Sequence, residues 1–242
     1  MRGTTTRERP AGQRASPGGA AAPSGSGEHV GLYVRVGRPL VRLVLLVVAL
    51  PPALVVSLPI VAVNAFLFRS LRRVLFTQER VGRAGRVFWI VKFRTMREVP
   101  ASAYDSWTSG LDRLRVTSFG RFLRNTHLDE LPQLVNILRG EMDFIGPRPE
   151  MVAIHEWACE HVPGFARRNA LLPGVTGLAQ VIQGYAGRDE AQYRRKLALD
   201  LEYLERLSFA TDLEILSRTA LWMARGKGWQ QVPRPRTEPG PG

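Results

Sequence analysis

The sequence predicts an α+β fold, mainly helical, with an N-terminal re-entrant membrane helix followed by a small membrane-associated domain that contains a short β-hairpin. Residues 43–68 form an uncharged apolar run. Two short runs of β-branched and aromatic residues lie within residues 74–96. Apolar residues recur at three- and four-residue spacing from residue 128 onward, and amphipathic helices are predicted for residues 190–207 and 212–225. At 242 residues and 45% hydrophobic composition, the chain is long enough to bury one sizeable core.

Four segments differ in composition. Residues 1–30 are rich in Gly, Ala, Ser, Pro and Arg, and residues 226–242 include "PRPRTEPGPG". Both are predicted to be disordered, because they hold too few large apolar side chains to offset the entropy of ordering. Residues 31–75 are predicted to form the membrane helix and an interfacial region, and residues 76–225 a folded domain.

The charge balance is strongly basic. Lys and Arg number 34 against 21 Asp and Glu, and only Lys92, Lys196 and Lys227 are lysines, so most of the positive charge is on guanidinium groups that stay protonated. The expected partners are anionic: nucleic acid, acidic lipid headgroups or phosphate-bearing small molecules. The single cysteine, Cys159, cannot form an intramolecular disulfide and fits no zinc-ligand spacing, which favours a reducing, cytoplasm-facing location.

The apolar run reads "LVLLVVALPPALVVSLPIVAVNAFLF" and exceeds the roughly 20 residues that cross a bilayer. Three arginines stand on each side of it: Arg35, Arg38 and Arg42 before it, and Arg69, Arg72 and Arg73 after it. A simple span carries its positive charge mainly on the cytoplasmic side. Both ends of this segment are therefore expected on that side.

Three prolines interrupt the same segment: Pro51, Pro52 and Pro59. Each interior proline removes a backbone hydrogen bond and clashes with the preceding turn, which favours a bend. The segment is therefore predicted to enter the membrane, break near Ser57 to Pro59 and return. The alternative is a kinked single span that places the N-terminus outside.

The stretch "LDELPQL" places two adjacent carboxylates, Asp129 and Glu130, ahead of Pro132. Because proline has no N–H to donate into a helix, the helix is expected to begin at Leu128 or Asp129, with Pro132 in its first turn. The unpaired N–H groups and the positive end of the macrodipole at that terminus favour ionised carboxylates and phosphate alike. The two acids either cap the helix or belong to a site that handles phosphate.

Nearby cationic residues are candidates to bind that phosphate. Arg124 precedes the acid pair by five residues. Arg148 stands between two prolines, which either preorganise it for two parallel hydrogen bonds to phosphate or form a rigid surface turn around it. Lys92, in "VKFRTM", is a phosphate contact or an edge-strand charge, and His127 is a candidate base.

Asp200 falls between Leu197 and Leu204, at the border of an apolar stripe on the helix predicted for residues 190–207. A partly buried acid needs a partner, so Asp200 either pairs with Lys196 or faces the same site as the acid pair. Two or three carboxylates among arginines suit a hard divalent cation that bridges to a substrate's phosphates. That arrangement is the chemistry of phosphoryl transfer.

Several linked motifs follow one another: "FTQERVGRAGRVFWIVKFRTM", "FLRNTHLDELPQLVNILRGEMDFIGPRPE", "PGVTGLAQV" and "KLALDLEYL". Over about residues 40–225 they resemble the bacterial sugar transferase family, the monotopic polyprenyl-phosphate phosphoglycosyl transferases. The resemblance implies transfer of a sugar 1-phosphate from a UDP-sugar to undecaprenyl phosphate with release of UMP, the initiating step of exopolysaccharide, capsule, O-antigen or glycoprotein glycan synthesis. It also implies an anchor in the bacterial inner membrane, with the catalytic domain, residues 76–225, on the cytoplasmic face.

The resemblance further implies roles for individual residues. Asp129 matches the nucleophile that attacks the β-phosphorus to form a covalent intermediate, and Glu130 matches the ligand of Mg²⁺. Lys92 and Asp200 match positions that the family needs for activity, and the two arginines named above match its phosphate-binding arginines.

The sequence departs from the family pattern at three places. Arg72 and Arg73 stand where many members have Gly-Pro, which favours stronger binding of lipid headgroups by the interfacial helix. Members begin with a re-entrant helix broken near a Ser-Pro pair, whereas a leucine separates Ser57 from Pro59 here. His127 stands where a small hydroxyl residue is commoner. The form of the bend and the surroundings of the nucleophile are therefore where this chain is expected to differ.

Two other classes of function compete. A nucleic-acid-binding protein would explain the arginines, but the charge is dispersed, much of it borders the apolar segment, and the sequence contains no recognised binding module, so no nucleic-acid partner is expected. A catalytically inactive, membrane-anchored homologue acting as a scaffold would keep the fold. The joint presence of Asp129, Glu130, Lys92 and Asp200 argues against it.

Overall fold

A computed structural model of the chain describes residues 31–98, 115–184 and 186–224. The two segments predicted to be disordered, residues 1–30 and 226–242, lie outside the described residues. Within the described part the protein is mainly helical, with a small sheet and one long apolar helix at its N-terminal end, as predicted.

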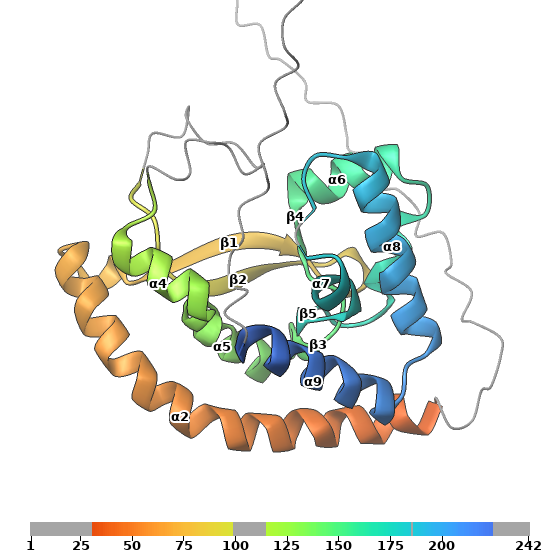
Figure 1. The fold of residues 1–242 in the computed structure, drawn as a ribbon, viewed down its shortest axis with the longest axis horizontal. Coiled ribbons are helices and arrows are strands. Elements are labelled where there is room, and N and C mark those ends of the chain that lie inside the picture. The colour runs from red at the N-terminus through yellow and green to blue at the C-terminus, as the bar shows by residue number, and fades with distance from the viewer. Residues whose placement is uncertain (1–30, 99–114, 185, 225–242) are drawn as a thin grey trace, which may run out of the picture.

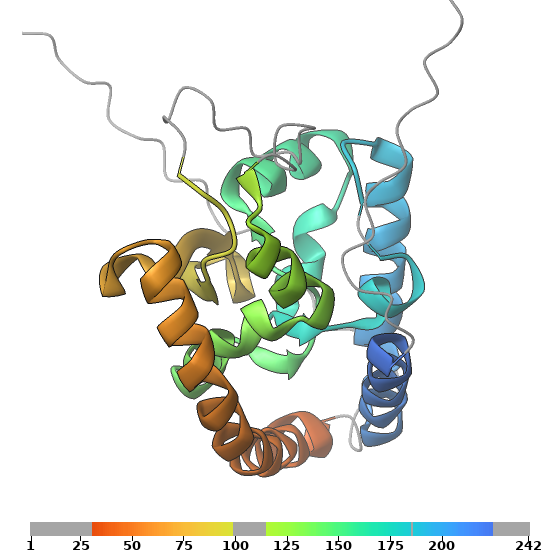
Figure 2. The same cartoon turned by 60° about the vertical axis from the view of Figure 1, so that its left-hand side comes forward.

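The long helix curves beneath the rest of the molecule (Figures 1 and 2). A short π-helical turn, Tyr33–Gly37, leads into α2, Arg38–Leu67, and the helical backbone continues through all three prolines. The predicted break near Ser57 to Pro59 is therefore wrong in form: the segment stays helical. A bend of the helix relieves the clash of each proline ring with the preceding turn and accommodates the loss of one backbone hydrogen bond.

One stripe of α2 packs against the domain. Leu46, Ala53 and Ile60, seven residues apart, are buried, as is Asn64. Most of the other side chains on the helix are exposed. Only 11% of its most apolar 18-residue stretch is buried within the protein. In the described part of the chain, this is the one helix long and apolar enough to cross a membrane, with mean hydropathy reaching 2.6.

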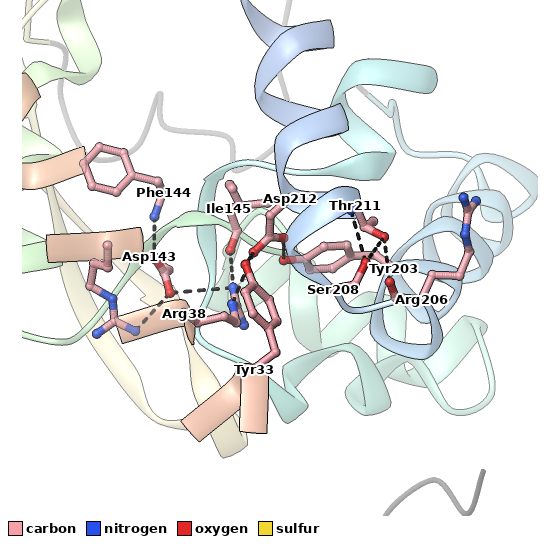
Figure 3. A network of polar contacts seen from close by, with 11 residues as sticks. Tyr33, Arg38, Asp143, Phe144, Ile145, Tyr203, Arg206, Ser208, Thr211 and Asp212 are labelled. Carbon is pink, nitrogen blue, oxygen red and sulfur yellow. Dashed lines mark hydrogen bonds and ion pairs between the residues drawn. The ribbon is translucent and has the colours of Figure 1, made fainter. Parts of the chain in front are cut away.

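A buried polar network fastens the beginning of this helix to the domain (Figure 3). Arg38 Nη2 donates a hydrogen bond of 2.7 Å to the carbonyl oxygen of Ile145. The same guanidinium forms ion pairs with Asp143, at 3.6 Å, and with Asp212, at 3.7 Å. The hydroxyl of Tyr33 donates to Asp212 at 2.6 Å. A charged side chain thus joins the start of the apolar helix to two later elements.

The far end of the helix is fastened to the domain as well. Asn64 Nδ2 donates to the carbonyl oxygens of Arg94, at 3.0 Å, and Val74, at 3.3 Å. Ile60 packs with Val74, Phe93 and other apolar residues in one cluster. Both ends of α2 therefore contact the same folded unit.

The predicted hairpin is confirmed. β1, Leu75–Val81, pairs antiparallel with β2, Val87–Phe93, around a tight turn in which Ala84 and Gly85 have φ values of 56° and 76°. A two-residue strand, β4, Glu150–Met151, joins the other edge of β1. Lys92 thus lies on an edge strand, with the opposite edge of the hairpin already paired.

A second, parallel pair was not predicted. β3, Asp143–Ile145, pairs with β5, Gly174–Thr176, and each strand has only three residues. Strands this short carry no readable alternation, so the sequence pattern could not reveal them.

The 3₁₀ turn η2, Leu71–Arg73, precedes β1, and the 3₁₀ turn η3, Arg83–Gly85, joins the hairpin strands. The helical elements after the hairpin are α4, Ser118–Thr126; η5, Leu128–Gln133; α5, Leu134–Leu138; α6, Val152–His161; η6, Phe165–Ala170; α7, Leu178–Ile182; α8, Glu190–Glu205; and α9, Phe209–Ala224. α8 and α9 confirm the helices predicted for residues 190–207 and 212–225. The helix predicted from residue 128 is present, but it opens as the 3₁₀ turn η5 before becoming α5. α8 and the neighbouring α6 form one wall of the domain (Figure 1).

Candidate active site

The acid pair lies where the sequence placed it, at the start of a helical element with Pro132 in its first turns. His127 ends α4 in the left-handed conformation, with φ 57°, and the chain then turns into η5. This abrupt junction brings Asp129 and Glu130 against the β-hairpin, because η5 packs on β2.

Two cationic side chains bind the carboxylate of Glu130. Lys92 Nζ donates to Glu130 Oε1 at 2.6 Å, and Arg148 Nη2 donates to the same oxygen at 2.6 Å. Arg148 Nη1 lies 3.4 Å from Oε2. Burial alone would raise the pKa of Glu130, but the charges of Arg148 and Lys92 and their hydrogen bonds outweigh it and hold the pKa well below its usual value. Glu130 is therefore ionised.

Asp129 has the opposite environment. Its side chain is buried, at 8% exposure, and among the described residues no hydrogen bond or ion pair holds its carboxylate. Burial raises its pKa to about 6, and the nearby charge of Lys92 partly opposes this rise. Adjacent carboxyl groups whose environments push their pKa values apart usually have different roles. Glu130 is fixed and permanently charged, whereas Asp129 is a desolvated carboxylate that is ionised near neutral pH.

Arg124 and Arg148 flank the pair from different elements. Arg124, on α4, donates through Nε to Thr95 Oγ1 at 2.9 Å, and its charge lowers the pKa of Asp129. Arg148 also contacts the carbonyl oxygen of Val175 at 3.4 Å. The structure thus brings together Lys92, both arginines and the acid pair.

The loop that carries Arg148 interlocks with the "PGVTG" turn. Gly146 N–H donates to the carbonyl of Thr176, and Gly174 N–H donates to the carbonyl of Pro147. A Cβ at Gly174 would lie 2.1 Å from Gly146 N, and one at Gly177 would lie 2.2 Å from Gly146 O, so neither position has room for a side chain. The backbone of this turn therefore packs directly against the backbone of the loop that carries Arg148, here called the arginine loop.

The predicted salt bridge between Asp200 and Lys196 is wrong. Asp200 is 1% exposed and accepts a 2.6 Å hydrogen bond from Arg168 Nε, whereas Lys196 pairs with Glu150. Arg168 Nη2 also donates to the main-chain carbonyl of Arg148, at 2.8 Å. Arg168 thus links Asp200 to the loop that carries Arg148.

Sequence reasoning missed Arg168 and Glu150. Both are buried, and the charges of Lys196 and Arg168 lower the pKa of Glu150 to about 2, although burial opposes that shift. "FARRNA" carries no periodicity or motif that distinguishes one arginine from the next. The one available signal was the position of Glu150 directly after "PRP".

The side-chain set fits Mg²⁺ only together with a phosphorylated ligand. No group of three or more His, Cys, Asp or Glu side chains that could hold a metal occurs in residues 31–98, 115–184 and 186–224. Mg²⁺ is commonly bound by one or two carboxylates, with substrate phosphates and water completing the octahedron. Asp129 and Glu130 offer that number, and Glu130 Oε2 carries only the long contact to Arg148.

A bilayer-length apolar helix lies along a small α+β domain, and three cationic side chains surround its acid pair. This arrangement suits a class of proteins that bind phosphate groups beside an apolar phase. The model of one family, "Bacterial sugar transferase", matches residues 36–226. The chain belongs to this family.

Three characterised or named relatives illustrate the family. The UDP-glucose:undecaprenyl-phosphate glucose-1-phosphate transferase of Caulobacter vibrioides is 41% identical over 175 residues, which cover 71% of this chain and 64% of the relative. The UDP-N-acetylgalactosamine-undecaprenyl-phosphate N-acetylgalactosaminephosphotransferase of Aeromonas hydrophila is 36% identical over 155 residues, 64% of this chain and 36% of that protein. The exopolysaccharide production protein PSS of Rhizobium leguminosarum is 35% identical over 185 residues, 73% and 92% of the two chains. The match thus spans less than two thirds of the first two relatives.

Proposed function

We propose that this chain transfers a sugar 1-phosphate from a UDP-sugar to undecaprenyl phosphate, through a covalent intermediate on Asp129, as the first step in building a bacterial polysaccharide or glycan. The observation that carries the proposal is the contrast within the acid pair: Glu130 is clamped by Lys92 and Arg148, whereas Asp129 is buried and has a raised pKa. The names of the relatives support the same substrates.

The chemistry divides into two displacements at phosphorus. In the first, a carboxylate oxygen of Asp129 bonds to the β-phosphorus of the UDP-sugar, and the bond from that phosphorus to the bridging oxygen breaks, so that UMP leaves with the electron pair. In the second, a phosphate oxygen of undecaprenyl phosphate bonds to the same phosphorus and the aspartyl oxygen leaves. Asp129 is regenerated, and the product is an undecaprenyl diphosphate sugar. A carboxylate nucleophile keeps the two anionic substrates from having to occupy the site together.

The neighbouring cations have the charge that this reaction needs. Phosphoryl transfer depends mainly on positioning and on neutralising the charge of the phosphoryl oxygens. We expect Arg124 and Arg148 to bind the donor's phosphates, and Lys92 pairs with Glu130. We expect bound Mg²⁺ to neutralise the donor's diphosphate. Glu130, through Oε2, and Asp129 are the residues that would hold it.

The contacts of α2 support a re-entrant membrane helix. Arg38 fastens its start and Asn64 its end to one domain, and a buried stripe runs between them. Because the domain contacts the helix along this whole length, a helix that crossed the bilayer would draw the polar domain into the hydrocarbon core. The exposed apolar face of the helix is then the part that enters the membrane. The arginines on both sides of the apolar segment favour a location of both helix ends at the cytoplasmic face of the inner membrane.

The structure weakens the nucleic-acid alternative. Arg38, Arg42, Lys92, Arg148 and Arg168 all pair with carboxylates, so much of the positive charge is compensated inside the fold. A binding surface for nucleic acid would present that charge to solvent. The scaffold alternative is disfavoured because the acid pair and its cations are assembled.

UMP release tests the proposal directly. The full chain in lipid nanodiscs is incubated with undecaprenyl phosphate, Mg²⁺ and a panel of UDP-sugars that includes UDP-glucose and UDP-N-acetylgalactosamine. We expect one or more donors to give UMP, and mass spectrometry to find a sugar phosphate on Asp129 when the lipid is left out. Asp129→Asn should lose turnover by on the order of 10³-fold or more and form no adduct, while remaining folded. Turnover retained by Asp129→Asn would exclude the mechanism, and no UMP from any donor would favour the scaffold.

A further inference from the structure

We propose that His127 and Trp222 form the acceptor side of this active site: His127 Nε2 hydrogen-bonds the phosphate of undecaprenyl phosphate, and the Trp222 indole packs against the first isoprene units. This inference rests on the proposed function and adds two residues to it. Neither belongs to the group of charged residues that surrounds Glu130.

His127 carries an unused polar atom next to the nucleophile. Its Nε2 is buried and has no hydrogen-bond partner among the described residues. The residue stands two positions before Asp129 with a φ of 57°, a conformation that is unusual for a residue other than glycine and that recurs at functional sites. An imidazole nitrogen that carries a proton donates one N–H. A phosphate oxygen would satisfy it.

Trp222 lies against that imidazole. The centroids of the two rings are 5.0 Å apart, and their planes are inclined at 39°. The residues on either side of Trp222 on α9, Leu221 and Met223, are 51% and 49% exposed. The surface through which a ligand would reach this ring is therefore apolar, which fits an isoprenoid and does not fit a nucleotide.

α9 connects the membrane helix to the nucleophile. At its start, Asp212 accepts the 2.6 Å hydrogen bond from Tyr33, and the Phe209 ring meets the Tyr33 ring edge-on at 6.5 Å between centroids. Near its end, Trp222 reaches His127. Phe209 and Leu213, near the start of α9, are 57% and 51% exposed. Exposed apolar side chains therefore lie near both ends of α9, with the exposed Ser217 and Arg218 between them. A lipid held beside α2 would follow α9 to Asp129.

A hydrogen bond between two hydroxyl groups holds the end of α9 in position. Thr219, three residues before Trp222, lies 2.8 Å from Thr176 at the end of β5. β5 also supplies the Val175 carbonyl that Arg148 contacts. β5 thus contacts both α9, which carries Trp222, and the loop that carries Arg148. Thr219 is therefore a positioning residue for Trp222.

The two half-reactions separate the acceptor side from the donor side. The full chain in nanodiscs is given UDP-glucose, or the donor that is active in the UMP assay, without lipid, and the rate of adduct formation is measured. The loaded protein is then given undecaprenyl phosphate or, as a second probe, water-soluble geranyl phosphate. Trp222→Leu and His127→Ser should form the adduct at the wild-type rate. Each should raise the KM for undecaprenyl phosphate about tenfold, the effect of losing one packed ring or one hydrogen bond.

The chain provides a matched control. Trp157 and His161 form another stacked pair, with centroids 4.7 Å apart, on α6. His161→Ser should leave both half-reactions unchanged, and Trp222→Phe, which keeps a ring, should retain most of the acceptor affinity. Geranyl phosphate should respond to His127→Ser as undecaprenyl phosphate does. A KM for the lipid within about twofold of wild type in Trp222→Leu and His127→Ser would overturn the inference, as would slowed adduct formation in either variant. Failure of wild-type protein to form any adduct would instead count against the proposed function.

Discussion

Arg168 donates a 2.8 Å hydrogen bond to the main-chain carbonyl of Arg148 while its Nε donates a 2.6 Å bond to Asp200. The guanidinium of Arg168 thus joins Asp200, on α8, to the loop that carries Arg148. The side chain of Arg148 in turn pairs with Glu130. The side chains of Arg168 and Asp200 are 1% and 2% exposed, so the pair has almost no solvent screening. We therefore predict a positioning role for Asp200.

Removing Asp200 should weaken both the fold and donor binding. Asp200→Ala leaves Arg168 buried and uncompensated, and we expect the free energy of unfolding to fall by about 3–5 kcal/mol. The milder Asp200→Asn should raise the KM for the UDP-sugar, because the arginine loop loses its support. Chemical denaturation and donor titrations measure the two effects.

The exposed ion pair between Arg194 and Glu190 provides the control, since both side chains are more than 40% exposed. Arg194→Ala should stay within about 1 kcal/mol of wild type. An Asp200→Asn protein with native stability and an unchanged KM for the donor would contradict the positioning role.

The rate of adduct formation should depend on pH through Asp129. Its pKa of about 6 means that the nucleophile is mostly protonated below that pH. The rate should rise about tenfold per pH unit below about pH 6 and level off above it, because the diphosphate of a UDP-sugar does not titrate in this range. Lys92→Met should move the midpoint upward, since the Lys92 charge lowers the pKa of Asp129. A flat profile between about pH 5 and about pH 8 would contradict this assignment.

The same raised pKa implies a cost in stability. The folded-state pKa of Asp129 lies above the ordinary value of 3.8 for an aspartate, so the unfolded chain releases the proton first as pH rises. The contribution of Asp129 to stability therefore declines between about pH 4 and about pH 6. Asp129→Asn, which stays neutral, should be more stable than wild type at neutral pH by up to roughly 3 kcal/mol. Thermal unfolding at several pH values checks this; equal stability of the two proteins would mean that Asp129 is not desolvated.

Both ends of the membrane helix should be accessible from the same side. Cys159 is free and exposed, so Cys159→Ser provides a background without a reactive thiol. In that background, Arg35→Cys and Arg72→Cys should both react with a membrane-impermeant maleimide in inverted inner-membrane vesicles and not in intact cells. Opposite labelling of the two positions would establish a single span.

Chelation should stop adduct formation, and added Mg²⁺ should restore it, because the donor's diphosphate then lacks its counter-charge. Glu130→Gln removes a candidate ligand and should raise the Mg²⁺ concentration for half-maximal rate by about tenfold or more. Glu156→Gln, at an exposed position on α6, should not change it. Full activity of wild type in excess chelator would show that the site works without the ion.

The sequence by itself determined the local features. The uncharged run predicted the long helix, the apolar periodicity predicted α8 and α9, and a proline without an N–H placed the acid pair at the start of a helical turn. These results depend on residues a few positions apart, where propensity and spacing act directly.

Tertiary structure decided which charges meet. Lys92 and Glu130 are 38 residues apart, Arg168 and Asp200 are 32 apart, and Arg38 lies 107 residues from the carbonyl that it binds. No periodicity encodes such pairings. Only packing of the hairpin, the arginine loop and α8 around one core selects Arg168 over Lys196 as the partner of Asp200. The same packing keeps α2 helical through its prolines, because buried contacts at both ends and along one stripe of the helix hold it against the domain.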